Sequence, residues 1–183
     1  MLFWRGRSEK GVVFSHLKSF DKILVTGPQR SGTRICAKMI AQDTGHHYVD
    51  EEHFGFLRKG CFRMMLESCN EIVVQCPALS RWIHEFSGDD TIIVFMKRNP
   101  EDVIASQERI GWGYEERELE QYGCKKGRQA RVKYDFWKKK QKPVIKHFLE
   151  VEYESLSKHP LWVPKENRKN FEWNQTKQSL DRV

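Results

Sequence analysis

The chain has 183 residues, and a single domain of that length buries roughly 70% of the surface that its unfolded chain exposes. Thirty-two Lys and Arg against 25 Asp and Glu give a net charge of +7, which favours anionic partners without naming one. The five cysteines are odd in number and include no CxxC pair, so neither a disulfide framework nor a zinc motif is expected.

Apolar stretches long enough for targeting or membrane insertion are missing from the sequence. Residues 1–20 contain no continuous run of signal-peptide length, and nothing later approaches the ~20 apolar residues of a membrane span. We therefore expect a soluble, cytoplasmic protein with reduced thiols.

Short apolar runs recur along the chain, and each has the length and composition of a buried strand. They lie at 23–27, 47–50, 72–76, 91–96 and 147–153, the second being the weakest. Helix-like segments separate them, which indicates a parallel sheet covered on both faces. We predict an α/β fold, a P-loop-like doubly wound sheet of about five mostly parallel strands.

The helices between these strands are predicted from the spacing of apolar residues and from one proline. Ile35, Met39 and Ile40 form an apolar face after the first strand. A second helix is expected over residues 79–86, and Pro100 suits the first turn of a third.

Two segments towards the C-terminus give weaker signals. Residues 115–141 are charged and helix-favouring but are interrupted at Gly123 and Gly127, so two helices or one bent helix would fit. Residues 157–183 have little periodicity and are expected to wrap the surface of a single domain spanning residues 1–183.

Residues 125–142 carry much of the positive charge. The stretch is open to two interpretations, a polyanion-binding surface or a solvated helix face beside an anionic ligand. We favour the second and do not expect nucleic acid as a partner, because no nucleic-acid-binding motif is present. The basic residues are Lys125, Lys126, Arg128, Arg131, Lys133, Lys138, Lys139, Lys140 and Lys142.

A strand, a glycine-bearing turn and a helix are indicated by "ILVTGPQRSGTRICAKMIA", residues 23–41. The turn has both glycines of the Walker A pattern, Gly27 and Gly32, but Thr33 stands where lysine is required and Arg34 where the magnesium-binding hydroxyl belongs. The strand ends "IVVQCP" and "IIVFMKRNP" supply no aspartate for magnesium. Backbone N–H groups at a helix N-terminus, together with the guanidinium of Arg30, predict an anion site instead.

A second element, "FMKRNPEDVIASQ" at residues 95–107, also runs from a strand through a proline turn into a helix. Together, "PQRSGTR" followed by "KRNPEDVIAS" resembles the sulfotransferase family, whose sulfonate donor is 3′-phosphoadenosine 5′-phosphosulfate. "VEYESL" at 151–156 resembles a strand end common in that family, so the resemblance covers roughly residues 22–156.

The resemblance implies a set of donor-binding residues and no metal. The first loop would bind the 5′-phosphosulfate, and an arginine with a serine eight residues later would bind the 3′-phosphate. The implied residues are Arg30, Ser31, Gly32, Thr33 and Arg34 in the loop, with Arg98 and Ser106 in the second element.

Two departures from the family pattern leave some roles open. Arg34 replaces a Thr or Ser that the family often has, and "NRKNFEW" matches the C-terminal Arg-Lys-Gly loop of many members only loosely. Donor contacts from Arg34, Arg168 and Lys169 are therefore undecided.

Sulfonate transfer requires stabilisation of the departing phosphate oxygen and a base for the acceptor proton. The resemblance assigns the first role to Arg30. For the base we choose Glu52 first and Glu51 second, because the "DEE" turn follows the second strand and should border the same crevice. The alternatives are that these acids cap the next helix, or that His84 is the base.

Other constellations are weaker. A zinc site from His46, His47, Glu51 and His53 matches no ligand spacing, and we predict no metal. The prediction is a sulfotransferase acting on a hydroxyl or amine. The sequence leaves the acceptor open among a sugar, a tyrosine, a lipid headgroup and a small alcohol, any of which could be anionic. The alternatives are a P-loop small-molecule or nucleoside kinase and a non-catalytic nucleotide- or polyanion-binding module.

Overall fold

The computed structural model of the chain describes residues 13–53, 59–111, 119–120, 122–123 and 128–164. Its centre is a five-stranded sheet in the order β2-β3-β1-β4-β5, and all four strand pairings are parallel. The strands are β1 (Lys22–Thr26), β2 (His47–Val49), β3 (Ile72–Gln75), β4 (Thr91–Lys97) and β5 (Phe148–Glu152). The predicted doubly wound α/β fold is confirmed.

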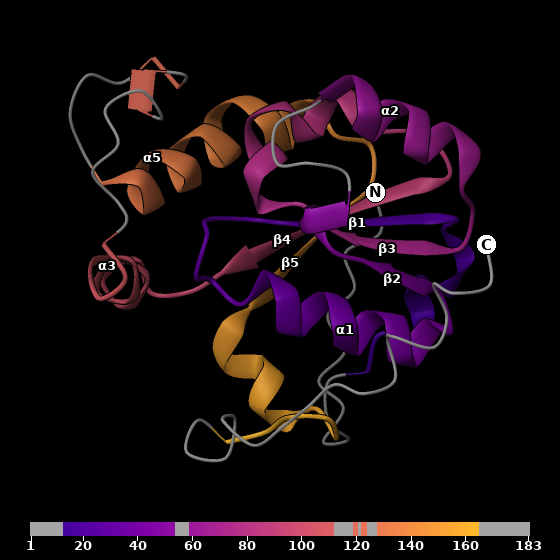
Figure 1. The fold of residues 1–183 in the computed structure, drawn as a ribbon, viewed down its shortest axis with the longest axis horizontal. Helices are drawn as coiled ribbons and strands as arrows, with labels where there is room; N and C mark the ends of the chain where they lie inside the picture. The colour runs from indigo at the N-terminus through magenta and orange to yellow at the C-terminus, as the bar shows by residue number, and fades with distance from the viewer. Residues whose placement is uncertain (1–12, 54–58, 112–118, 121, 124–127, 165–183) are drawn as a thin grey trace.

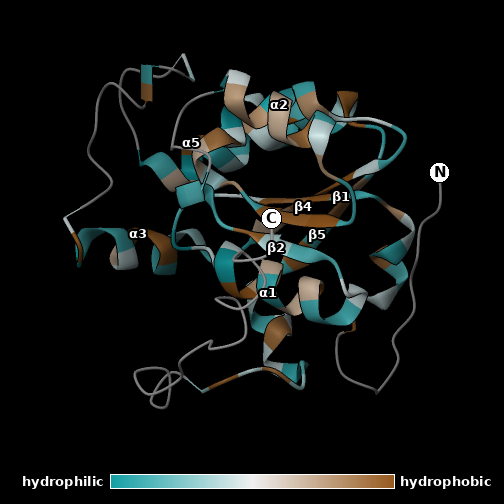
Figure 2. Ribbon diagram, turned by 45° about the vertical axis from the view of Figure 1, so that its right-hand side comes forward, coloured by the Kyte–Doolittle hydropathy of each residue, from teal (hydrophilic) through white to brown (hydrophobic). Residues whose placement is uncertain are grey.

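The central strands are buried because helices cover both of their faces. Ile23, Leu24 and Val25 of β1 have no solvent exposure, and Figure 2 shows the strands as the most hydrophobic part of the ribbon. Successive side chains point to opposite faces, so Val25 packs with α1 (Thr33–Thr44) while Leu24 packs on the other side. A continuous apolar run therefore suits a strand that is covered twice.

Each face of the sheet has its own layer of helices (Figure 1). On one face lie α1, the short 3₁₀ helix η1 (Ser15–Ser19) and part of η6 (Tyr153–Lys158). On the other lie α2 (Lys59–Ser68), η3 (Pro77–Phe86) and α5 (Gln129–Phe136). Two large hydrophobic clusters, one for each face, form most of the core, and a smaller one lies between α5 and the helix that follows β4.

The predicted helices are largely present, with two differences. The third helix, α3 (Pro100–Glu108), begins with the expected proline, and the Asn99 side chain caps it by accepting the Glu101 N–H at 2.9 Å. The helix predicted over residues 79–86 is a 3₁₀ helix, η3, whose apolar spacing resembles that of an α-helix. The helix α2 was not predicted.

Beyond α5 the chain makes one unusual turn. Residues Trp137–Gln141 wind as a π-helix, η4, before the short η5 (Lys142–Val144) leads to β5. The prediction for residues 115–141 is met by α5 and η4, while 115–118, 121 and 124–127 lie outside the described residues. Of the wrapping segment, 157–164 is described, and its Leu161 and Trp162 pack on the core.

None of the helices in the described parts of the chain is long and apolar enough to cross a membrane.

Candidate functional site

The loop between β1 and α1 has the backbone conformation of an anion-binding turn. Gly27 (φ 143°), Gly32 (φ 97°) and Arg30 (φ 74°) all adopt positive φ, which is unusual for arginine. The Ser31 N–H closes a turn to the Pro28 carbonyl at 3.1 Å. The loop therefore holds a specific shape instead of merely connecting two elements.

At the end of this loop, α1 starts without a side-chain cap. Its N-cap is Gly32, and the first N–H groups of a helix have no partner inside it. The Ser31 side chain beside it is fully buried, and its Oγ has no hydrogen-bond partner in the described structure. A buried hydroxyl without a partner is costly. This end of α1 is therefore suited to an anion, which would accept hydrogen bonds from the Ser31 hydroxyl and from the first N–H groups of the helix.

Three arginines meet beside the loop, and we call Arg30, Arg98 and Arg109 the arginine cluster. The Ser106 hydroxyl accepts from Arg30 Nε at 3.2 Å and from Arg109 Nη2 at 3.4 Å. Arg98 Nη1 donates to the Arg30 carbonyl at 3.1 Å. The two predicted motifs, 27–34 and 98–106, are thus in direct contact.

No carboxylate partners the arginine cluster within the part of the chain that the structure describes. Its guanidinium groups contact a hydroxyl, a carbonyl and the Tyr153 ring, whose centroid lies 4.4 Å from Arg98 Cζ. Arg98 Nε is buried and has no partner among the described residues. Three like charges this close repel one another, so a multiply charged anion would relieve an existing cost.

Tyr153 and Tyr134 position the cluster. The Tyr134 hydroxyl accepts the Arg98 N–H and donates to the Arg98 carbonyl, both at 2.8 Å. A Cβ on Gly32 would lie 2.4 Å from the Tyr153 ring, so only glycine fits there. The loop is therefore packed at Gly32 against a residue that follows β5.

Arg34 behaves differently from the arginine cluster. Its guanidinium forms ion pairs with Asp50 at 2.9 Å and with Glu52 at 3.0 Å. Asp50 also accepts the Tyr48 hydroxyl at 2.6 Å. Burial acts to raise the pKa of Asp50, but the Tyr48 hydroxyl and Arg34 outweigh it, and the pKa is lowered overall. We call this group, Arg34, Tyr48, Asp50 and Glu52, the paired edge.

Glu51 has different partners from Glu52, at the end of β3 and the start of η3. Its Oε2 accepts the Ala78 N–H at 3.2 Å, and its Oε1 lies 3.5 Å from Gln75 Nε2, which also donates to Thr33 Oγ1 at 3.2 Å. Burial raises the pKa of Glu51, although the Ala78 N–H and Gln75 oppose the rise. A carboxylate with a raised pKa is better suited to accept a proton than one held in an ion pair.

Sequence reasoning missed three residues of this region. Gln75 could have been found, because it is the polar end of an otherwise apolar strand. Arg109 lies three residues after Ser106, the spacing of neighbours on one helix face. Tyr153 carries no local signal for its contact with Gly32.

Much of the basic stretch is already neutralised. Ion pairs join Arg128 to Glu108, Arg131 to Glu101, Lys139 to Asp135 and Lys142 to Glu150. A continuous polyanion-binding surface would need these charges unpaired. Among the described residues, no three His, Cys, Asp or Glu side chains come together as a metal site, and His46 bonds the Phe20 carbonyl at 2.8 Å.

No protein-family model matches the chain, and no curated protein matches it significantly.

Proposed function

We propose that the chain is a sulfotransferase that moves a sulfonate group from 3′-phosphoadenosine 5′-phosphosulfate to an acceptor hydroxyl or amine. The observation that carries the proposal is the arginine cluster, which lacks a carboxylate partner among the described residues and adjoins the uncapped start of α1. A ligand with two separate anionic groups suits two adjacent sites of this kind.

In this proposal each anionic group has its own set of donors. The 5′-phosphosulfate lies at the N-terminus of α1, where Thr33 and the buried Ser31 hydroxyl are at hand. The 3′-phosphate takes Arg98, Ser106 and Arg109. Arg30 belongs to the loop and joins it to the second set, since its side chain donates to Ser106 and its carbonyl accepts from Arg98.

The chemistry assigns Arg30 and Glu51 to opposite ends of the transfer. The acceptor oxygen or nitrogen forms a bond to sulfur while the bond between sulfur and the 5′-phosphate oxygen breaks. The departing oxygen keeps the electron pair, and Arg30 with the loop N–H groups stabilises its charge. Glu51 takes the acceptor proton. We prefer it to Glu52, whose side chain is 64% exposed and paired with Arg34.

The donor is tested with its product, adenosine 3′,5′-bisphosphate. This nucleotide should raise the melting temperature, with a stabilisation of ~2.7 kcal/mol at a hundredfold excess over its dissociation constant. ATP with magnesium should do much less, because it lacks the 3′-phosphate. Equal shifts from both nucleotides would contradict the proposal and favour a kinase. A screen of acceptors with radiolabelled donor then tests transfer itself.

A further inference from the structure

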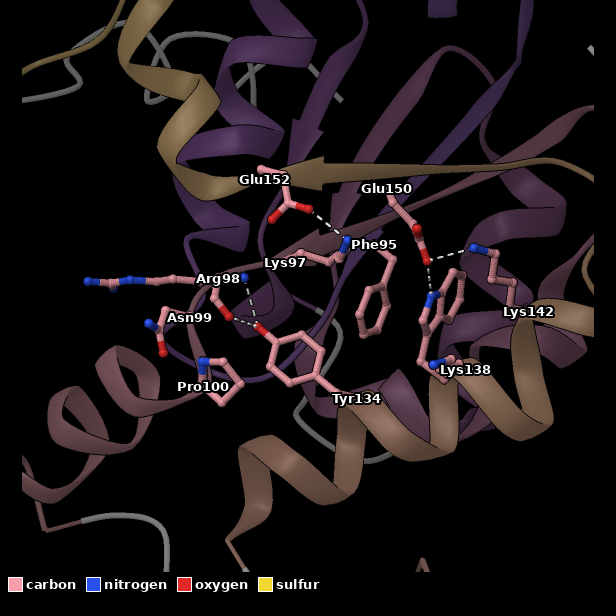
Figure 3. Close-up of a pocket in the computed structure, with 11 residues that line it drawn as sticks. Phe95, Lys97, Arg98, Asn99, Pro100, Tyr134, Lys138, Lys142, Glu150 and Glu152 are labelled. Atoms are coloured by element: carbon pink, nitrogen blue, oxygen red, sulfur yellow. Dashed lines mark hydrogen bonds and ion pairs between the residues drawn. The ribbon is translucent and has the colours of Figure 1, made fainter. Parts of the chain in front are cut away.

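A cavity of about 540 Å³ lies between the carboxyl ends of β4 and β5 and the helical segment α5–η4 (Figure 3). Its size is within the range of small-molecule sites, roughly 300 to 1,000 Å³. The cavity adjoins the arginine cluster at Arg98, which also lines it, but the Arg98 side chain points away from the other lining side chains. Nothing in the proposed transfer uses it.

Three aromatic residues give the cavity an apolar wall. Phe95 stacks on Trp137 with ring centroids 4.2 Å apart and meets Tyr134 edge to face at 6.0 Å. The polar atoms of this wall are satisfied, because the Tyr134 hydroxyl bonds the Arg98 backbone and Trp137 Nε1 donates to Glu150 Oε1 at 2.9 Å. Phe95 and Trp137 are only 1% and 2% exposed, so Tyr134, packed on Phe95, is the ring that offers apolar surface to a ligand.

The charged residues that line the cavity are four cations, Lys97, Arg98, Lys138 and Lys142, and two carboxylates, Glu150 and Glu152. Lys97 pairs with Glu152 at 2.6 Å, and Lys142 pairs with Glu150 at 3.0 Å. Burial acts to raise the pKa of Glu150, but Trp137 and Lys142 lower it overall, which keeps the carboxylate charged. Lys138 also lines the cavity, and it makes no ion pair with any residue that the structure describes.

The backbone beside the cavity is also unusual. Trp137 and Lys138 open the π-helix η4, and Gln141 anchors its end by donating to the carbonyls of Ser80 and Arg81. Single π-helical turns are rare in proteins, and those that occur are frequently found at functional sites. This turn presents an aromatic ring and an ammonium group side by side.

We propose that this pocket binds a small organic monoanion with an aromatic or other apolar body, such as a carboxylate or a sulfate monoester. The apolar body contacts the Tyr134 ring, and the anionic group pairs with Lys138. The inference does not depend on the proposed transfer reaction.

The test is calorimetric titration of the full chain with 2-naphthyl sulfate, with and without saturating adenosine 3′,5′-bisphosphate. We expect saturable binding at one site, and about tenfold weaker binding in Lys138→Met, the scale of one exposed charge-assisted hydrogen bond. Lys140→Met is the matched control, because Lys140 is exposed on the same helical segment but does not line the cavity. Neutral 2-naphthol should bind equally to all three proteins.

Several results would overturn the inference. They are absence of saturable binding, an equal loss in Lys140→Met, equal affinity for methyl sulfate, and complete displacement by the bisphosphate. The last result would assign the sulfate group to the loop. Failure of the bisphosphate itself to bind would refute the proposed donor site, and the lysine comparison would still decide the pocket.

Discussion

The arginine cluster and the paired edge lie on either side of the same loop and use the same side chain differently. Arg34 is surrounded by carboxylates, so its charge is already balanced within the protein. Arg30, Arg98 and Arg109 meet hydroxyl, carbonyl and aromatic groups and have no carboxylate partner among the described residues. An arginine without a carboxylate partner in the protein is available to bind an anionic ligand. An arginine that is paired with carboxylates has a structural role.

The largest effect on turnover is expected at Glu51, and the neighbouring Glu52 of the paired edge provides the comparison. Glu51→Gln should keep donor affinity but lose about 10²-fold or more in turnover, the usual scale for a missing general base. Glu52→Gln is the matched control and should change turnover little. The measurement is single-turnover transfer by both variants, made once an acceptor is known.

The pH dependence of the wild type sharpens this test. Because Glu51 has a raised pKa, the acid limb of the rate profile should lie above the ordinary glutamate value of 4.5. The limb should vanish in Glu51→Gln. Loss of turnover in Glu52→Gln with full activity in Glu51→Gln would show that Glu52, and not Glu51, is the general base.

Donor binding should distinguish the two groups of arginines directly. Arg98→Ala should weaken binding of adenosine 3′,5′-bisphosphate by about 1.5 to 3 kcal/mol through loss of a charge-assisted hydrogen bond. The variant should also discriminate poorly between bisphosphate and adenosine 5′-monophosphate. Arg34→Ala should bind both as the wild type does. Equal losses of affinity in the two variants would contradict the distinction between the arginine cluster and the paired edge.

The loop shape should matter to both regions through Gly32. Gly32→Ala adds a Cβ 2.4 Å from the Tyr153 ring at a residue with φ 97°, so it should lower the free energy of unfolding by roughly 1 to 3 kcal/mol. Gly60→Ala in α2 is the control, because a Cβ there meets no atom within 4 Å and alanine favours a helix. Chemical denaturation compares the two, and a neutral Gly32→Ala would mean that the ring moves freely.

The smallest effect is expected at the paired edge. The pKa of Asp50 is lowered, so its contribution to stability is complete above the ordinary value of 3.8 and is lost as the pH falls through the folded-state value. Asp50→Asn should cost about 1 kcal/mol at pH 7 and should lose less stability than the wild type on acidification. Parallel denaturation curves from pH 7 to pH 3 would contradict this.

The sequence predicted the sheet and the loop because both depend on local signals. Apolar β-branched runs give β1, β3 and β4, and the glycines around Arg30 give the turn. The contact of Arg30 with Ser106 was not predicted, because the resemblance assigned the two residues to different anionic groups of the donor.

Other features depend on tertiary contacts that no local pattern reports. Glu51 and Glu52 are adjacent in the sequence, and a short 3₁₀ turn sends them to opposite environments. The same apolar spacing suits an α-helix and the 3₁₀ helix η3. The ion pairs of Arg34 could not be predicted, because its two carboxylate partners come from another segment.

The contact between Gly32 and Tyr153 also constrains the order of folding. The two residues are separated by most of the chain, and Tyr153 follows the last strand of the sheet. Contacts between distant residues form late, because the intervening chain must first be ordered. When only β1 to β4 have emerged from the ribosome, the loop is therefore already synthesised but does not yet pack against Tyr153. Ligand-binding competence should appear abruptly, when β5 docks, and not gradually as each motif emerges.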